Sequence, residues 1–411
     1  MANLTSSYGP ISLKNPILLS AADHTHNSDQ IKQAIDAGAA AVVPKTLTND
    51  PTFMGESVVT RYRVLDSHFK PVNGRPPRGF SLISRGGGMK TDEDPWIEQI
   101  GELVEYAKPK DAKIIASIWG SIPWMVERAK QLEAVGVAGI EIDVGCPHLD
   151  GNKENNGEGN IGSVSERTRG LEAVVQAVGI PVFYKVASRS ASDIKNLIPQ
   201  IKAMGFAGAT MHNRYLGFIP DIETGKPIMD AYGGIGGSWT LPLTLYSVYQ
   251  ARLADPTFPM CGTNGACSAE DVLRFLMTGT SAVEICSIVL TTGYEIITKM
   301  IRDLELYLDR KGIENISDLV GIAADSALSR PQIKAIKECA SIDEDKCIQC
   351  GTCVKRCPWG ALSFENGRIQ VLKRDLDQYS NYHIPGCLGC GLCTTLCPKE
   401  AISLVKRKSL G

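Results

Sequence analysis

The sequence predicts an α/β protein, a closed (β/α)8 barrel followed by a small cysteine-rich α+β domain, and three observations carry that prediction. From residue 16 to about residue 310, short apolar runs alternate with amphipathic segments. These runs number about eight, the count that a closed barrel of parallel strands requires. Eight of the 13 cysteines lie between Cys347 and Cys397. We therefore expect a barrel at residues 1–311, a linker at 312–340 and a second domain at 341–411.

The apolar runs show little polar alternation, which is typical of parallel strands buried on both faces. The predicted strands are residues 17–21, 40–44, 114–118, 140–144, 182–186, 209–212, 260–263 and 283–287. Predicted helices between them include residues 28–37, 123–134, 190–204 and 268–278, the last with Ser268 as its N-cap. An open doubly wound sheet would usually carry a Gly-x-Gly-x-x-Gly turn after its first strand. Residues 20–24 read Ser-Ala-Ala-Asp-His, which favours the barrel.

Composition and charge exclude several classes of protein. Hydrophobic residues make up 43% of the chain and charged residues 21%, as in ordinary globular proteins. No apolar run reaches the length of a membrane span, and the N-terminus lacks the features of a secretory signal. The net charge of −2 comes with scattered lysines and arginines, so no basic stripe offers itself to nucleic acid or anionic lipid. We expect a cytoplasmic protein with neither nucleic-acid nor membrane partners.

One segment, residues 49–96, is too long for an ordinary connection and is rich in Gly, Pro and Arg. Its arginines are Arg61, Arg63, Arg75, Arg78 and Arg85, and three glycines follow at 86–88. This excursion could form a rim over the barrel mouth or contact another subunit. A merely solvated excursion is an equal alternative.

The candidate catalytic residue is Cys146, which directly follows the predicted strand at 140–144. Chemistry in alternating strand and helix folds collects at the carboxyl ends of the strands, so a thiol there faces a ligand. The next segment, residues 149–162, is rich in Gly and Asn and could close over a substrate. The alternative is that Cys146 is a small buried apolar residue.

Three clusters of small residues at or near the ends of late predicted strands suggest a phosphate cup. They are residues 233–237, 262–265 and the pair Cys286 and Ser287. In barrels a cofactor phosphate commonly sits at the loops after strands seven and eight. Lys45 and Lys185 end the second and fifth strands, where burial alone predicts no charge. Such a cation can stabilise negative charge on a reduced cofactor ring, although an imine-forming lysine or a structural ion pair would look the same.

The clustered cysteines form two copies of one spacing, Cys-x2-Cys-x2-Cys-x3-Cys-Pro, which is typical of bacterial two-cluster ferredoxins. The fourth cysteine of each copy ligates the other cluster in that arrangement. The expected ligand sets are Cys347, Cys350, Cys353 with Cys397, and Cys387, Cys390, Cys393 with Cys357. Two structural zinc ions are the alternative, but zinc sites favour paired two-plus-two spacings. Asn366 and Gly367 predict a hairpin turn between the copies, and Cys261, Cys267 and Cys339 are expected to be structural.

The order of these features resembles the FMN barrel of dihydroorotate and dihydropyrimidine dehydrogenases over roughly residues 9–310. Cys146-Pro147-His148, Lys185, Asn213 and the late glycine clusters carry the resemblance. It implies that Cys146 acts as general acid or base on the substrate. The residues that it implies for FMN are Ala22, Lys45, Asp143, Lys185, His212, Gly236, Gly237, Gly262, Asn264, Gly265, Cys286 and Ser287. Those that it implies for the substrate are Asp143, Asn213 and Arg214.

The chain departs from the family pattern where the substrate is expected. Asp143 stands where an Asn is usual, Arg214 replaces a Thr or Ser after Asn213, and Asn264 replaces a Gly in the phosphate turn. The flavin frame is therefore expected to be intact and the substrate contacts to be altered. Uracil and orotate themselves are placed in doubt.

A flavin beside two one-electron clusters implies conversion between hydride transfer and single-electron transfer at a ring CH–CH bond. The chain has no dinucleotide fingerprint, so we expect an FAD- and NAD(P)H-dependent partner subunit, as in bacterial two-subunit dihydropyrimidine dehydrogenases, or a ferredoxin, within a homo- or hetero-oligomer. The alternatives are another cyclic enone, aromatic or carboxylated substrate, a tRNA-reducing flavoprotein, and an electron-transfer module without its own substrate. The lack of a basic face disfavours the tRNA enzyme.

Overall fold

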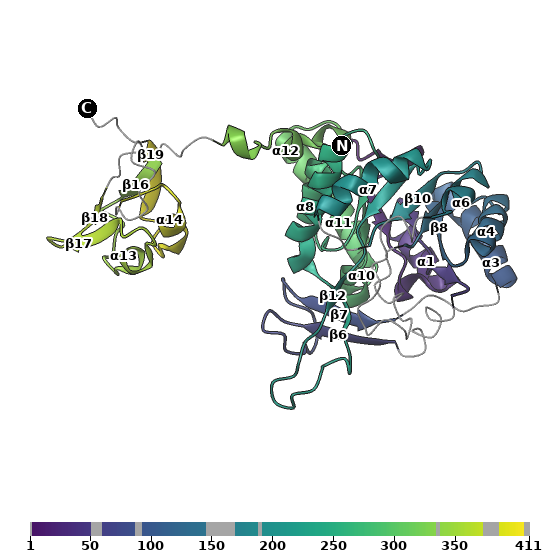
Figure 1. Cartoon of the computed structure of the whole chain (residues 1–411), viewed down its shortest axis with the longest axis horizontal. Helices are drawn as coiled ribbons and strands as arrows, with labels where there is room; N and C mark the ends of the chain where they lie inside the picture. The colour runs from purple at the N-terminus through teal and green to yellow at the C-terminus, as the bar shows by residue number, and fades with distance from the viewer. Residues whose placement is uncertain are drawn as a thin grey trace. The chain divides into compact units, whose positions relative to one another are not determined.

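The computed structural model describes residues 2–50, 60–86, 93–144, 169–187, 191–333, 338–372 and 386–406. The chain forms two compact units, one ending at Ser326 and the other beginning at Ala327 (Figure 1). Half of the predicted linker thus belongs to the first unit: the short helix α12 (Ile322–Asp325) is held there by a 2.7 Å ion pair between Arg252 and Asp325. Within these ranges no helix has both the length and the apolar character needed to cross a membrane.

The first unit is a closed barrel of eight parallel strands, which confirms the predicted fold. The strands are β3 (Ile17–Leu19), β4 (Ala41–Val42), β8 (Lys113–Trp119), β9 (Gly139–Ile142), β10 (Val182–Lys185), β11 (Gly208–Met211), β14 (Met260–Gly262) and β15 (Ala282–Ile285). They follow the order β4-β3-β15-β14-β11-β10-β9-β8, and pairing of β4 with β8 closes the ring. A further short strand, β5 (Leu47–Thr48), continues past β4 along β8.

Helices surround the barrel, and the predicted ones are all present. They are α1 (Ser28–Asp36), α3 (Glu93–Ala107), α4 (Ile122–Ala134), α6 (Glu172–Gln176), α7 (Ala191–Ala203), α8 (Leu241–Ala254), α9 (Ala269–Thr278), α10 (Ser287–Thr292) and α11 (Glu295–Lys311). Ser268 caps α9 as predicted, because its side chain accepts a hydrogen bond from the backbone N–H of Asp271. The described residues of β9, β10, β11 and β15 are all buried, as strands covered on both faces must be.

An N-terminal hairpin closes the end of the barrel at which the strands begin. Its strands are β1 (Ser6–Tyr8) and β2 (Ile11–Leu13). The Tyr8 ring stacks on Phe183 of β10 with centroids 3.9 Å apart, and it packs against Gly208 at the start of β11. The hairpin does not cover the opposite end of the barrel, where the strands finish, so that end is available to a ligand.

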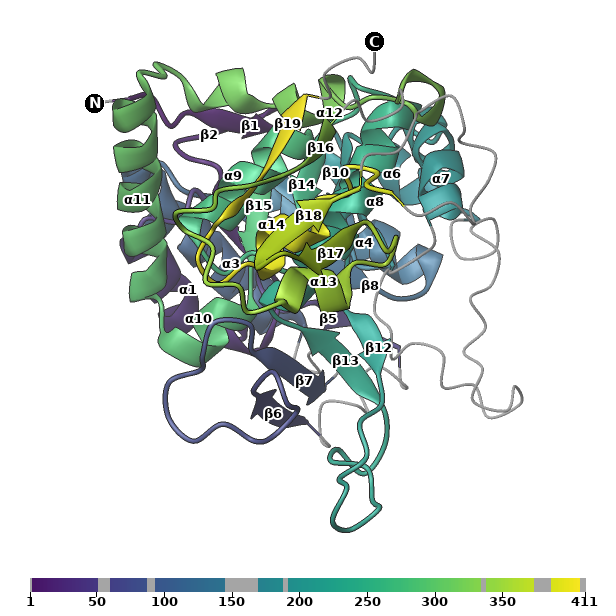
Figure 2. The ribbon, with the colours of Figure 1, turned by 90° about the vertical axis from the view of Figure 1, so that its left-hand side faces the viewer.

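The long excursion contributes to a second sheet, which we call the mouth sheet. It consists of β6 (Arg61–Leu65), β7 (Ser81–Arg85), β12 (Tyr215–Gly217) and β13 (Gly233–Gly236), antiparallel in the order β12-β13-β7-β6. Figure 2 shows these strands together at one end of the barrel. Two of the arginines are engaged beside this sheet: Arg61 pairs with Asp230, and Arg85 donates to the carbonyl of Met229. Other side chains of the excursion face the pocket described below.

The described residues of the second unit form two sheets and two short helices. Strand β16 (Glu338–Ile342) pairs antiparallel with β19 (Ile402–Lys406), and β17 (Leu362–Glu365) pairs with β18 (Arg368–Val371). Asn366 and Gly367 join the second pair with positive φ angles, which confirms the predicted hairpin turn. The helices are α13 (Thr352–Arg356) and α14 (Leu392–Leu396).

Candidate functional site

A pocket lies between the carboxyl ends of the barrel strands and the mouth sheet. It contains about 820 Å³ of space, part of it open to solvent. Its lining residues are Ser20, Ala21, Ala22, Asp23, Lys45, Thr46, Tyr62, Leu82, Ser84, Gly86, Asp143, Lys185, His212, Asn213, Arg214, Thr263, Asn264, Cys286, Ser287 and Leu290. Ten of the residues implicated by sequence therefore meet at one pocket: Ala22, Lys45, Asp143, Lys185, His212, Asn213, Arg214, Asn264, Cys286 and Ser287.

The predicted phosphate cup has a counterpart where β13, β14 and β15 end. A Cβ atom on Gly236 would lie 3.0 Å from Ser287 Oγ and 3.3 Å from Asn264 Oδ1, so only glycine leaves these two polar groups uncrowded. Asn264 adopts a positive φ of 65° and is fixed by Thr240, which donates to its Oδ1 at 3.1 Å. A hydroxyl beside an open glycine turn suits an anionic group, so these residues fit the phosphate of a mononucleotide.

The other three glycines assigned to the cofactor each lie close against a neighbouring group, and their contact with the cofactor stays a prediction. A Cβ on Gly237 would lie 2.2 Å from the carbonyl oxygen of Phe80, and one on Gly265 would lie 2.7 Å from the backbone of Leu241. A Cβ on Gly262 would meet the Phe275 ring at 2.3 Å. Like Gly236, none of the three is among the residues that line the pocket. Sequence alone could not separate these close approaches from ligand contacts, because both require glycine.

One wall of the pocket carries a linked set of charged and phenolic groups. Lys45 forms a 2.6 Å ion pair with Asp23, which also accepts a hydrogen bond from Tyr62 of β6. Burial would raise the pKa of Asp23, but the charge of Lys45 outweighs it and lowers the pKa below its usual value. Across the mouth sheet, Arg214 donates to the hydroxyl of Ser84. The excursion therefore supplies part of the pocket wall through Tyr62 and Ser84.

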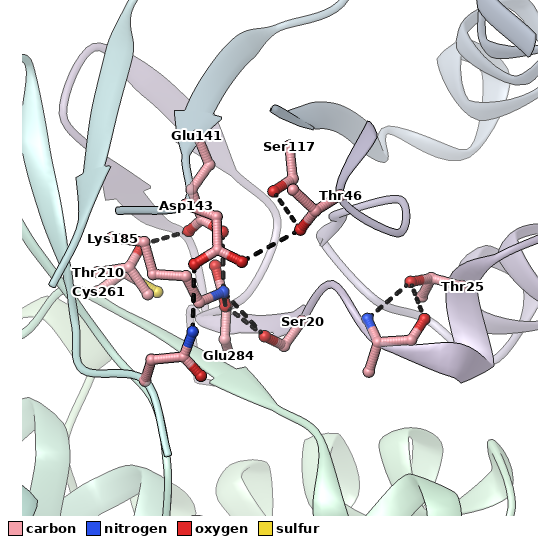
Figure 3. A network of polar contacts seen from close by, with 12 residues as sticks. Ser20, Thr25, Thr46, Ser117, Glu141, Asp143, Lys185, Thr210, Cys261 and Glu284 are labelled. Atoms are coloured by element: carbon pink, nitrogen blue, oxygen red, sulfur yellow. Dashed lines mark hydrogen bonds and ion pairs between the residues drawn. The ribbon is translucent and has the colours of Figure 1, made fainter. Parts of the chain in front are cut away.

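Asp143, the carboxylate at the position where the family has an amide, is buried in the pocket wall. Its Oδ1 accepts from Asn213 Nδ2 at 3.1 Å, and its Oδ2 accepts from Thr46 at 3.2 Å (Figure 3). Burial raises the pKa of Asp143, although the nearby charge of Lys185 opposes that rise. Two of the three residues assigned to the substrate, Asp143 and Asn213, thus orient each other.

Lys185 reaches the pocket but is held from below by two carboxylates. Its Nζ lies 2.8 Å from Glu141 Oε1 and 3.1 Å from Glu284 Oε2, and it donates to Ser20 Oγ at 3.2 Å. Burial alone would lower the pKa of Lys185, but the two carboxylates raise it well above its usual value. An ammonium is expected here, not the neutral amine that imine formation needs.

His212 lines the pocket with both ring nitrogens engaged. Nδ1 lies 2.7 Å from the carbonyl oxygen of Asn213, and Nε2 lies 2.9 Å from the hydroxyl of Tyr215. Burial lowers the pKa of His212, so the ring is neutral near pH 7. Nδ1 therefore donates to the carbonyl and Nε2 accepts from the phenol, which leaves the ring a fixed part of the wall.

The predicted catalytic Cys146 and the predicted closing segment at 149–162 lie outside the described residues. Cys286, which lines the pocket, is described. Burial raises the pKa of Cys286 to about 11, so its thiol is protonated at neutral pH.

In the second unit, the eight clustered cysteines border two separate cavities. Cys347, Cys350, Cys353 and Cys397 line one; Cys357, Cys387, Cys390 and Cys393 line the other, together with Cys353. This grouping coincides with the two ligand sets expected from sequence. Three sulfurs also accept backbone hydrogen bonds: Cys397 from Ala401 at 3.2 Å, Cys387 from Ala340 at 3.3 Å and Cys357 from Ala361 at 3.4 Å. Donors of this kind stabilise negative charge on cluster sulfurs.

Sequence reasoning missed the two carboxylates under the pocket and the contribution of Asp23 and Tyr62. A signal for the first was present. Glu141 and Glu284 each stand inside an apolar strand, which is the same anomaly that pointed to the lysines. Tyr62 could not have been found, because its place depends on pairing between segments far apart in the chain.

Comparison with known proteins agrees with this architecture. Residues 3–308 match the dihydroorotate dehydrogenase family, and residues 340–404 match the 4Fe-4S dicluster domain. Similar proteins include a protein named dihydroorotate dehydrogenase B (NAD(+)), catalytic subunit, from Thermoplasma acidophilum, 25% identical over 79% of this chain and 99% of its own length. The proteins of the same name from Geobacillus sp. and Shouchella clausii are 28% identical (76% of this chain, 92% of theirs) and 32% identical (51% and 68%).

The family match covers most of the chain, including every barrel strand and the whole described lining of the pocket. The second match covers all eight clustered cysteines. The chain therefore belongs to the dihydroorotate dehydrogenase family and carries a 4Fe-4S dicluster domain after its barrel.

Proposed function

We propose that this chain is an FMN-dependent oxidoreductase that reduces or forms the ring double bond of a pyrimidine-like compound and exchanges electrons through two 4Fe-4S clusters. The observation that carries the proposal is the pocket of a family barrel, in which Asn264 and Ser287 meet two lysine side chains at the carboxyl ends of the strands. FMN supplies hydride transfer when bound. The residues of the chain bind the cofactor and the substrate, orient them, and exchange protons with the substrate.

Gly236, Asn264 and Ser287 would hold the phosphate of FMN, with Lys45 and Lys185 toward its ring. The ammonium of Lys185 lines the pocket and is kept charged by its carboxylate partners, so it can stabilise negative charge on the ring. Lys45 stays close to Asp23, which fixes its position at the pocket wall.

Asp143, Asn213 and Arg214 would meet the substrate, and Cys146 would exchange the proton at the ring carbon. The names of the relatives make dihydroorotate the first substrate to consider. A second candidate, another ring that bears a carboxylate, is favoured by Arg214, because a guanidinium that lines the pocket suits an anionic group. The proposal that the substrate is a dihydropyrimidine rests on the sequence resemblance.

The relatives are named as catalytic subunits of NAD(+)-dependent enzymes, which supports a partner chain for this one. We propose that the partner carries FAD and the nicotinamide site, and that the clusters connect it to the FMN. A ferredoxin is the alternative electron partner.

The experiment that tests the function is a panel of oxidants for the chemically reduced, purified chain under anaerobic conditions. Reoxidation of the flavin would be followed with orotate, uracil, thymine and an aromatic carboxylate. We expect one ring to reoxidise the flavin at least about tenfold faster than the others, because pocket contacts typically discriminate by 1–3 kcal/mol. Reoxidation by artificial electron carriers but by no ring compound would favour the electron-transfer module.

Replacing Gly236 by Val should weaken FMN binding. Side-chain atoms would enter the space beside Ser287 and Asn264, and overpacking of this kind costs about 1–3 kcal/mol, or about 5- to 150-fold in Kd. FMN titration of the cofactor-stripped chain measures the effect. Gly179→Val is the matched control: Gly179 is exposed at the opposite end of the barrel, and its neighbour within 4 Å is the flexible tip of Glu133. Equal FMN affinity in both variants would remove Gly236 from the site.

A further inference from the structure

The layer beneath the pocket is polar and charged, whereas barrel interiors are usually filled by apolar side chains. Glu141 of β9, Lys185 of β10 and Glu284 of β15 point toward one another there (Figure 3). Glu141 and Glu284 are each 1% exposed and Lys185 is 4% exposed. Two ionised carboxylates with one ammonium would leave a net negative charge in the barrel, which is costly without a further positive charge.

The hydrogen bonds differ between the two carboxylates. Glu284 Oε2 accepts from both Lys185 and Ser20, at 3.1 and 2.7 Å, so it has the donors that an ionised carboxylate needs. Glu141 accepts from Lys185 with Oε1, but its Oε2 lies 2.6 Å from the hydroxyl of Thr210. A hydroxyl can donate or accept, so this second contact suits either an ionised or a protonated Glu141.

The chain of hydroxyls continues away from the pocket. Thr210 Oγ1 lies 3.0 Å from the hydroxyl of Tyr8, and either atom can be the donor. Rotation of the Thr210 hydroxyl therefore allows Glu141 to gain or lose a proton without breaking the contact. Glu284 has no such freedom at the oxygen that already accepts two hydrogen bonds.

We propose that Glu141 is a positioning residue that holds one proton under the flavin site near neutral pH, while Glu284 remains the ionised counter-ion of Lys185. The effect on flavin reduction rests on the proposed FMN function. The presence of the proton on Glu141 does not depend on that function. With the proton bound, the layer is neutral. Without it, the layer is negative and opposes the negative charge that reduction places above Lys185.

The surroundings of Glu141 agree with this assignment. Burial, and then the charge of Glu284, raise the pKa of Glu141 to about 7, while Lys185 and Thr210 act in the opposite direction. Among the described residues, the other titratable groups that interact with members of the cluster are Tyr8 of β1, Cys261 of β14, Asp143 and Cys286. Burial raises the pKa of Tyr8 and of Cys261 well above their usual values, so neither carries charge near pH 7.

Glu141→Gln tests the proposal because glutamine has the shape of a protonated glutamate. Its side-chain oxygen can accept from Lys185 and its amide can donate to Thr210. At pH 6 the variant and the unaltered chain should show the same ratio of reduced to oxidised FMN at a fixed ambient potential. At pH 9 the variant should show about a tenfold higher ratio, equal to about 30 mV for a two-electron couple. The proposal would be overturned if the variant and the unaltered chain had equal ratios of reduced to oxidised FMN at both pH values. It would also be overturned if their ratios differed by the same factor at pH 6 and at pH 9.

Tyr8→Phe is the matched control, since it removes a hydroxyl from the same chain without removing a charge. It should keep the pH dependence of the unaltered protein. A readout that needs no flavin is the infrared carbonyl band of a protonated carboxyl, which should be present at pH 6, decline toward pH 9 and be missing at both in Glu141→Gln. If that variant does not fold, Thr210→Val should shift the band by removing the hydrogen bond to Oε2.

The two readouts separate this inference from the proposed function. A chain that binds no FMN but shows the titrating band would refute the function and keep the proton on Glu141. A chain that binds FMN but shows no band that depends on Glu141 or Thr210 would refute the inference alone.

Discussion

Cys146→Ala is expected to lower turnover by about 10²- to 10⁴-fold, the usual contribution of a positioned general acid or base. FMN and iron content should stay unchanged, because the proposed cofactor contacts lie on other residues. The expectation rests on the place of Cys146 in the sequence, four residues after Ile142, the last residue of β9. A thiol with an unperturbed pKa of about 8.5 is mostly protonated at neutral pH and can give its proton to a substrate carbon.

The measurement is the pH profile of turnover for the unaltered chain, Cys146→Ala and Cys146→Ser. A hydroxyl can still relay a proton, so the Ser variant should retain more activity than Ala and show a more alkaline optimum. Cys267→Ala is the control, since this half-buried cysteine lies outside the pocket lining. Wild-type rates in Cys146→Ala from about pH 6 to about pH 9 would make the thiol structural. The donor would then be sought at a group other than His212, because both nitrogens of that ring are engaged.

The barrel could be predicted because its strands obey a local rule. Each of the eight is a short apolar run flanked by helix signals, and strands such as β10 and β15 are buried along their whole length. The mouth sheet obeys no such rule. Its strands β7 and β13 pair across a large separation in sequence, and β13 consists of three glycines and an isoleucine, which locally indicate a turn. Only the closed barrel brings those two segments together.

The candidate site likewise has a part that could be predicted from the sequence and a part that could not. Residues at strand ends, such as Lys45, Asp143 and Ser287, could be assigned to one pocket because all barrel strands end on the same side. What each side chain contacts there could not be foreseen. Lys185 was expected to face a flavin, and it does reach the pocket, yet its ammonium is bound from below by Glu141 and Glu284. The adjacency of β9 and β10 could have suggested the first partner, whereas β15 lies across the barrel.

Single replacement of Cys397 by Ala is expected to remove one of the two clusters, leaving about four of about eight irons per chain. Cys397 borders the same cavity as Cys347, Cys350 and Cys353, although it belongs to the other copy of the sequence repeat. The double replacement of Cys353 and Cys397 should therefore lose no more iron than either single one. The double replacement of Cys353 and Cys357 should lose both clusters, although these two cysteines belong to the same copy of the repeat.

Iron content and the cluster absorbance of the anaerobically purified variants measure this pattern. Cys339→Ala is the control, because Cys339 is buried in the same unit and lies outside both predicted sets. If each replacement acted only on its own copy of the repeat, Cys353 and Cys357 would behave as one group and the crossed sets would be wrong. Zinc in place of iron would contradict the clusters altogether.

The same variants report where electrons enter. The unaltered chain alone should oxidise NADH or NADPH only slowly, because it lacks a dinucleotide fingerprint, and should gain that activity with its partner chain. Cys397→Ala should lose the partner-dependent activity while an artificial donor still drives reduction of the ring substrate at the FMN. Loss of both activities in a variant that retains its FMN would mean that the cluster serves the chemistry at the barrel as well as the transfer of electrons. Retention of both would place the entry of electrons directly at the barrel.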